Sequence, residues 1–112
     1  MPESHDQFCK RLLERGNPEE LREWVKSGPN TLGEGKSHLS SVRTAEKIYR
    51  LGAVKAYAIE IFVDNSGKVV IELPRNPNKR KGLFEWAAKI ARGLGFGPTP
   101  DEGQQYLFVM LD

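Results

Sequence analysis

Residues 53–73 constrain the fold of this chain more than any other stretch. Two apolar runs flank residues 64–67, whose sequence is Asp-Asn-Ser-Gly. Asn and Gly tolerate the positive φ angles that tight turns between strands require. The stretch is therefore predicted to form a β-hairpin.

The side chains of this hairpin also indicate its register. With Gly67 in a left-handed bulge, Asp64 faces Lys68 across the ladder. Residues 59, 61 and 63 then oppose residues 73, 71 and 69, which gives one wholly apolar face. A shift by one residue would break up that face, so this register is the expected one.

The other face of the predicted hairpin is mixed. It places Phe62 opposite Val70, and Glu60 opposite Glu72. Two carboxylates opposite each other normally destabilise a sheet. This face needs a cover, either the N-terminal helices or a second copy of the chain, so Glu60, Phe62, Val70 and Glu72 are predicted to form a partner interface.

Length and composition indicate an ordinary globular protein. The 112 residues suit one domain over residues 1–112, with 38% apolar and 29% charged residues. The net charge is only +2, which taken globally neither favours nor excludes nucleic acid. A single cysteine, no signal pattern and no long apolar run predict a cytoplasmic protein without a disulfide framework or a membrane segment.

The first 28 residues are predicted to form a helical hairpin. Ser4 and Gln7 have the spacing of a capping box at the start of a first helix. Asn17, Pro18 and Glu20 give the same signal for a second helix, with proline at its first position.

The remaining segment, residues 39–112, is predicted to form the α-β-β-α-β core. A third helix begins at Ser40 or Ser41 and runs to about residue 51, and the β-hairpin follows it. Asn78 caps a fourth helix that ends near residue 92, and residues 105–111 form a last strand.

The expected fold is α+β, with a three-stranded, mainly antiparallel sheet. The long apolar segment 53–63 is best suited to the centre of the sheet, so the last strand is expected to pair with it. This arrangement resembles a ferredoxin-like sandwich truncated at its first strand, and residues Thr31 to Gly35 are a candidate edge strand in its place.

Residues 33–37, Gly-Glu-Gly-Lys-Ser, resemble the tail of a phosphate-binding loop. The full pattern needs a glycine where Asn30 stands, and a strand before it. A flexible connector is therefore the favoured interpretation. In a weaker form, Lys36 and Ser37 bind an anion at the start of the third helix.

A second candidate anion site is the basic turn at Arg75, Lys79, Arg80 and Lys81. Three of these cations lie in the first turn of the fourth helix, where the helix dipole favours acids. A phosphate, such as that of a nucleic-acid backbone, would offset this. The favoured interpretation is still a solvated basic turn, with Phe84 as its only aromatic neighbour because Trp86 is expected in the core.

No set of residues predicts catalysis or a metal site. His5 and Cys9 lie one helical turn apart but lack a third partner, so we expect a solvated histidine and a semi-buried thiol. Glu60 and Glu72 also lack a third group for acid–base work or cation binding.

The sequence thus predicts a small non-catalytic binding or regulatory module without a cofactor. Its expected partner is another protein or a second copy of itself, bound through the second sheet face. The alternative is nucleic-acid or phospholigand binding through the basic turn 75–81. An enzyme or metal site at Glu60 and Glu72 is a weaker alternative.

Overall fold

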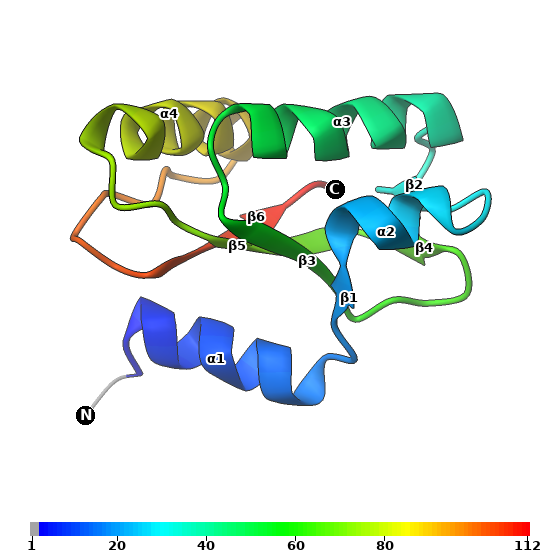
Figure 1. The fold of residues 1–112 in the computed structure, drawn as a ribbon, viewed down its shortest axis with the longest axis horizontal. Coiled ribbons are helices and arrows are strands. Elements are labelled where there is room, and N and C mark those ends of the chain that lie inside the picture. Colours follow the sequence, from blue (N-terminus) through cyan, green and yellow to red (C-terminus); the bar gives the residue numbers. More distant parts are fainter. Residues whose placement is uncertain (1–2) are drawn as a thin grey trace.

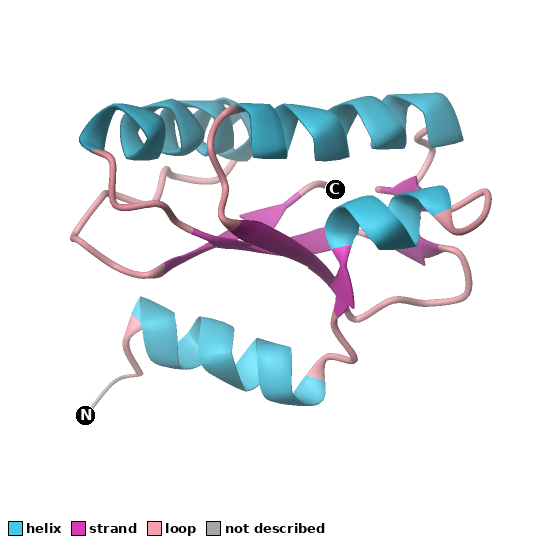
Figure 2. Cartoon of the chain, in the orientation of Figure 1, coloured by secondary structure: helices cyan, strands magenta, loops and turns pink. Residues whose placement is uncertain are grey.

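The computed structural model describes residues 3–112 and shows an α+β fold around a four-stranded antiparallel sheet (Figures 1 and 2). The helices are α1 (His5–Arg15), α2 (Leu21–Lys26), α3 (His38–Arg50) and α4 (Pro77–Gly93). The strands are β1 (Glu19–Glu20), β2 (Thr31–Leu32), β3 (Lys55–Ile59), β4 (Asn65–Ser66), β5 (Lys68–Glu72) and β6 (Tyr106–Met110). The predicted α+β class is confirmed, but the sheet has four strands where three were expected.

The order of strands in the sheet is β1-β3-β5-β6, and each pair is antiparallel. The expected pairing of the last strand with residues 53–63 is wrong, because β6 lies beside β5. The other edge of β3 is taken by β1, where Glu19 lies opposite Ala58. Within residues 31–35, β2 forms, but it pairs with β4 in a separate two-stranded parallel sheet.

The predicted hairpin register is also wrong. Lys68 lies opposite Ile59, five residues earlier than the expected partner Asp64. The chain leaves β3 after Ile59 and makes a wide excursion before β5, with Val63 at a φ of 58°. Because the shift is an odd number of residues, β3 turns over relative to the prediction and Ile59 joins the opposite face.

The sheet has helices on both faces, as Figure 1 shows. α2, α3 and α4 cover one face, whereas α1 crosses the other. The predicted helical hairpin over residues 1–28 is therefore wrong, because α1 and α2 are separated by β1 at the sheet edge. Asn17 is a left-handed bend residue with a φ of 49°, and Glu20 caps α2 in its place.

Side-chain caps set the other helix starts. The capping box of Ser4 and Gln7 at the start of α1 is confirmed. The third and fourth helices begin earlier than predicted, because Ser37 caps α3 and Asn76 caps α4. Pro77 then occupies the first turn of α4, where its missing N–H leaves no bond unmade.

The two faces of the sheet enclose two separate apolar cores. The upper core lies under α2, α3 and α4, and includes Ile48, Leu83 and Ile71. The lower core lies over α1, where Val70 meets Cys9. All five of these side chains are fully buried, so both faces of β5 are closed to solvent.

The first turn of α1 is bound to the outer edge of β6. The Asp6 carboxylate accepts hydrogen bonds from the N–H groups of Gln105 and Tyr106, both at 2.9 Å. His5 Nε2 accepts the N–H of Phe108 at 3.2 Å. The expectation of a solvated His5 is therefore wrong, because this ring has a structural hydrogen bond.

We expect this contact to make the fold sensitive to pH. Burial lowers the pKa of His5 below 6.5, although the charges of Asp6 and Glu102 act in the opposite direction. The unfolded chain thus takes up the proton first as the pH falls. The stability that His5 contributes is complete above pH 6.5 and is lost between pH 6.5 and the lower pKa of the folded state.

Urea unfolding between pH 8 and pH 5 measures this loss. The variant His5→Asn keeps a hydrogen-bond acceptor but does not titrate in this range, so its stability should fall less than that of the native protein. Equal losses in the two proteins would show that His5 contributes nothing to the pH dependence.

Candidate anion-binding surface

α3 and α4 both lie above the sheet (Figure 1). They run in opposite directions, because the end of α3 lies beside the start of α4 and the start of α3 lies beside the end of α4. The end of α3 meets the start of α4 at Gly52, which has a φ of 117°. A Cβ atom at Gly52 would lie 2.8–2.9 Å from the side chain of Lys79, too close for a real contact. A glycine is therefore required where the two helices approach at this end.

A groove runs between the two helices. Its wider part has a volume of about 330 Å³ and lies between the first half of α3 and the end of α4. A second hollow of about 270 Å³ adjoins it and shares Ser40, Thr44 and Trp86 with it. The lining of the wider part is mixed, and its apolar members are Leu32, Trp86, Ile90, Leu94 and Leu111.

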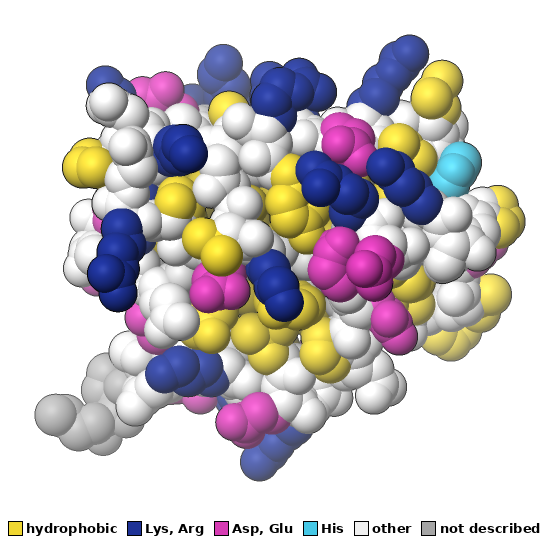
Figure 3. All heavy atoms as spheres, viewed as in Figure 1, with side chains coloured by type: hydrophobic (Ala, Val, Ile, Leu, Met, Phe, Trp, Pro, Cys, Tyr) yellow, Lys and Arg dark blue, Asp and Glu magenta, His cyan; other side chains and the backbone are white. Residues whose placement is uncertain are grey.

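The rim of this groove is basic. Lys36 lines the wider part, and Arg43 and Lys47 line the adjoining hollow. Within residues 3–112, none of these three cations forms a salt bridge. Figure 3 shows Lys and Arg side chains spread along the top of the molecule, over α3 and α4.

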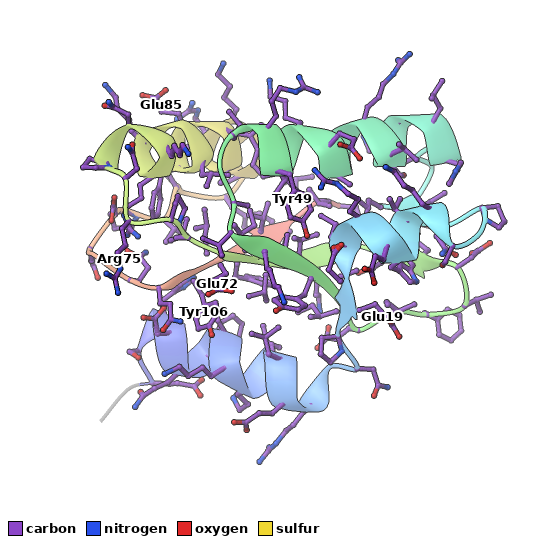
Figure 4. The ribbon with its side chains drawn as sticks, in the orientation of Figure 1. Glu19, Tyr49, Glu72, Arg75, Glu85 and Tyr106 are labelled. Carbon is purple, nitrogen blue, oxygen red and sulfur yellow. The ribbon has the colours of Figure 1, made fainter. Side chains whose placement is uncertain are left out.

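Acidic side chains balance little of this charge. Glu85 points away from the sheet on the outer side of α4, 3.9 Å from Lys81 (Figure 4). Glu46 of α3 is bound by α2 instead, with Lys26 at 2.9 Å and Arg22 at 3.3 Å. The Lys26 hydrogen bond and the Arg22 charge lower the pKa of Glu46, so this carboxylate is held ionised at the α2 side.

Trp86 is the aromatic residue at the centre of this surface. The sequence predicts that Trp86 is buried in the core, and its side chain does pack against the upper core. It is only half-buried, however, and it lines both parts of the groove. Phe84, the aromatic residue favoured from the sequence, lies 5.7 Å from the guanidinium of Arg80.

Sequence reasoning missed Arg43, Lys47 and Trp86 as site residues. A signal for the first two was present, because residues 43, 47 and 50 are all basic and recur at helical spacing. The position of Trp86 depends on how α4 is rotated over the sheet, and the sequence pattern alone does not set that rotation.

The residues predicted to bind anions lie at opposite ends of the α3–α4 layer. Lys36 and Ser37 lie at the start of α3, beside the end of α4. The Ser37 hydroxyl accepts the N–H of Ser40 at 3.0 Å, so it serves as a helix cap. Lys36 remains exposed in the groove.

The basic turn lies at the other end and divides into two kinds of residue. Arg75, Lys79 and Lys81 are exposed. Arg80 binds Asp101 through two hydrogen bonds of 2.7 and 3.2 Å, and its side chain is only 13% exposed. Arg80 therefore fastens the loop 94–105 to the start of α4.

The four residues predicted to form one interface do not share a face. Val70 is fully buried against α1, whereas Phe62 is exposed in the excursion between β3 and β5. Glu60 follows the end of β3 and forms a salt bridge with Lys68. Glu72 lies opposite Lys55 on β3. On its other side it lies beside Tyr106 of β6 (Figure 4).

The structure does not support a reactive cysteine or a metal site. Burial raises the pKa of the Cys9 thiol to about 12, so a reactive thiolate does not form at neutral pH. Within residues 3–112, no group of three or more His, Cys, Asp or Glu side chains is placed to hold a metal ion. The described helices also include none with both the length and the apolar content needed to cross a membrane.

Comparisons of the chain with models of known families, with curated proteins and with solved structures give no match. The inference of function therefore depends on the geometry and charge of the surface.

We expect Arg80 to contribute to stability rather than to anion binding. Arg80→Ala removes both hydrogen bonds to Asp101 and should destabilise the protein by about 1–2 kcal/mol. Asp101 also accepts the N–H of Gly103 at 3.0 Å, so hydrogen exchange at Gly103 should accelerate. The control is Arg75→Ala, which removes an exposed cation outside this contact. Similar exchange in the two variants would contradict the assignment.

Proposed function

We propose that this protein is a non-catalytic module that binds single-stranded nucleic acid through the groove between α3 and α4. One observation carries the proposal: half-buried Trp86 lines the same hollow as Arg43 and Lys47, and neither cation forms a salt bridge within residues 3–112. Proteins that bind single strands combine a basic channel for the phosphates with aromatic side chains on which bases stack.

The charge distribution supports this proposal better than the net charge does. Seven exposed cations lie on α3 and α4, and Lys36 lies just before α3; the seven are Arg43, Lys47, Arg50, Lys79, Lys81, Lys89 and Arg92. Those at the two ends include Lys36, Lys79 and Lys81 of the predicted anion sites. A flexible nucleic-acid strand that lies along the groove would pass both of these ends. The two predicted anion sites would then contact the same strand.

Docking of a protein on the second sheet face has less support. That idea requires Val70 and its neighbours to be open, and α1 lies over them. The binding surface proposed here is on the other side of the sheet and is formed mainly by α3, α4 and the loop before α3, with Leu32 and Leu111 also in its lining.

Two finer expectations from the sequence stay predictions. The order β1, α2, α3, β3, β5, α4, β6 is similar to the β-α-β-β-α-β succession of a ferredoxin-like fold, although the strands joined through helices are adjacent and antiparallel here, whereas a split β-α-β unit joins parallel strands that are not neighbours. A cytoplasmic setting agrees with the free, buried Cys9.

We expect charge reversal in the groove to weaken binding strongly. In Arg43→Glu with Lys47→Glu, affinity for a fluorescein-labelled single strand should fall roughly tenfold or more at low salt. A strand that contacts four cations gives a slope of about −3 for log K against log salt, which should weaken to about −1.4 when two contacts are lost. Fluorescence anisotropy at several salt concentrations measures both quantities.

The matched control is Lys10→Glu with Arg15→Glu. These residues are exposed on α1, and the pair changes the net charge by the same amount. The control should bind as the native protein does. Equal weakening in the two variants, or no binding by the native protein at low salt, would refute the proposal.

We also expect bases to stack on Trp86. In Trp24→Phe, Trp86 is the sole remaining tryptophan, and its fluorescence should be quenched by the bound strand. Trp86→Leu should lower affinity about fivefold or more, since stacking contributes about 1–3 kcal/mol per base. Trp86→Phe should retain most of the affinity. An unchanged affinity in a folded Trp86→Leu protein would exclude stacking.

A further inference from the structure

The excursion between β3 and β5 ends in an apolar tip, formed by Phe62 and Val63. The turn is tight, because Phe62 and Asn65 exchange both backbone hydrogen bonds, at 2.9 and 3.1 Å. Phe62 is 80% exposed and Val63 is 82% exposed, more than any other large apolar residue that the structure describes. The upper and lower cores therefore gain nothing from these two side chains.

Val63 is also unfavourable for the backbone. Its φ of 58° lies in the left-handed region, which β-branched residues rarely adopt. The first central position of a two-residue hairpin turn with positive φ is normally a glycine. A valine that strains the turn and lies in solvent is thus explained by neither local structure nor packing, and a contact outside the described chain would explain it.

The surroundings of the tip are acidic. Asp64 follows it directly, is exposed and forms no salt bridge within residues 3–112. Ile61 precedes the tip and shares a hollow with Glu19 and Trp24. A surface that accepts this tip should therefore have an apolar floor and a basic rim.

The groove between α3 and α4 has both properties. Ile90 and Leu94 are apolar members of its lining, and Lys36 and Arg43 are cations of the same lining. We infer that the apolar tip of one molecule docks into the α3–α4 groove of a second copy. This inference goes beyond the proposed function and does not depend on it, because it follows from the match of the two surfaces.

The contact joins two different surfaces, so a single contact between two copies is head to tail. Each complex keeps one free tip and one free groove, and further copies add as the concentration rises. A small contact of this kind is expected to be weak and salt-dependent. A nucleic-acid strand in the groove would compete with the tip.

Complementation between two defective variants tests the inference. The tip variant carries Phe62→Ser and Val63→Gly and keeps an intact groove. The groove variant carries Arg43→Glu and Lys47→Glu and keeps an intact tip. In sedimentation equilibrium, the mass of the native protein should rise with concentration, whereas each variant alone should associate at least tenfold more weakly. An equal mixture should form a one-to-one heterodimer.

Two controls separate docking from altered folding. Phe96→Ser with Val54→Ser removes the same two residue types from other exposed positions and should associate as the native protein does. The tip variant should melt at a higher temperature than the native protein, because glycine relieves the strain at position 63.

Three outcomes would overturn the inference. They are a native protein that stays monomeric at millimolar concentration, a tip variant that associates normally, and a mixture that behaves as two separate monomers. A failure to bind oligonucleotide would refute the proposed function and leave this result unaffected.

Discussion

The burial of Val70 against Cys9 is the contact on which the rest of the structure depends. Both faces of β5 are closed, with Val69 and Ile71 on one side and Val70 on the other. A sheet with two apolar faces needs a layer on each side. α1 supplies the second layer, and this leaves α2, α3 and α4 together on the first. α3 and α4 form the outer surface of that first layer, so the groove between them is open to solvent.

Charge is distributed according to this layering. The lower side combines Glu3, Asp6 and Glu14 with Lys10, Arg11 and Arg15, so its charges compensate one another. On the upper side, Glu46 is bound by Lys26 and Arg22 and does not offset the groove cations. A net charge of +2 thus hides a markedly uneven surface. Recognition by such a protein depends on where its charges lie and on what aromatic or apolar surface lies between them.

Features with a local cause were predictable from the sequence. The capping box of Ser4 and Gln7 and the strand at residues 106–110 depend on neighbouring residues, and both are as expected. Pairing was not predictable, because β1 is only Glu19 and Glu20, two residues without any strand pattern. The predicted register was wrong for a similar reason. The excursion after Ile59 includes non-glycine residues with positive φ angles, and the turn preferences of these residues do not indicate such a conformation. Among the groove residues, Lys36 was predicted from the sequence. Trp86 was not, because its position depends on how α4 is rotated over the sheet, and the predicted strand order of that sheet was wrong.

The hydrogen bonds between α1 and β6 have a consequence for how the chain is made. Asp6 is separated from Gln105 and Tyr106 by 99 and 100 residues, and His5 from Phe108 by 103. On the ribosome, α1 has no edge to bind until β6 has been synthesised. Until then Val70 and Ile59 lack their full cover, and the growing chain presents an open sheet face of the kind that aggregates or attracts chaperones. Closure of the lower core is thus a late event, and contacts so distant in sequence also slow folding.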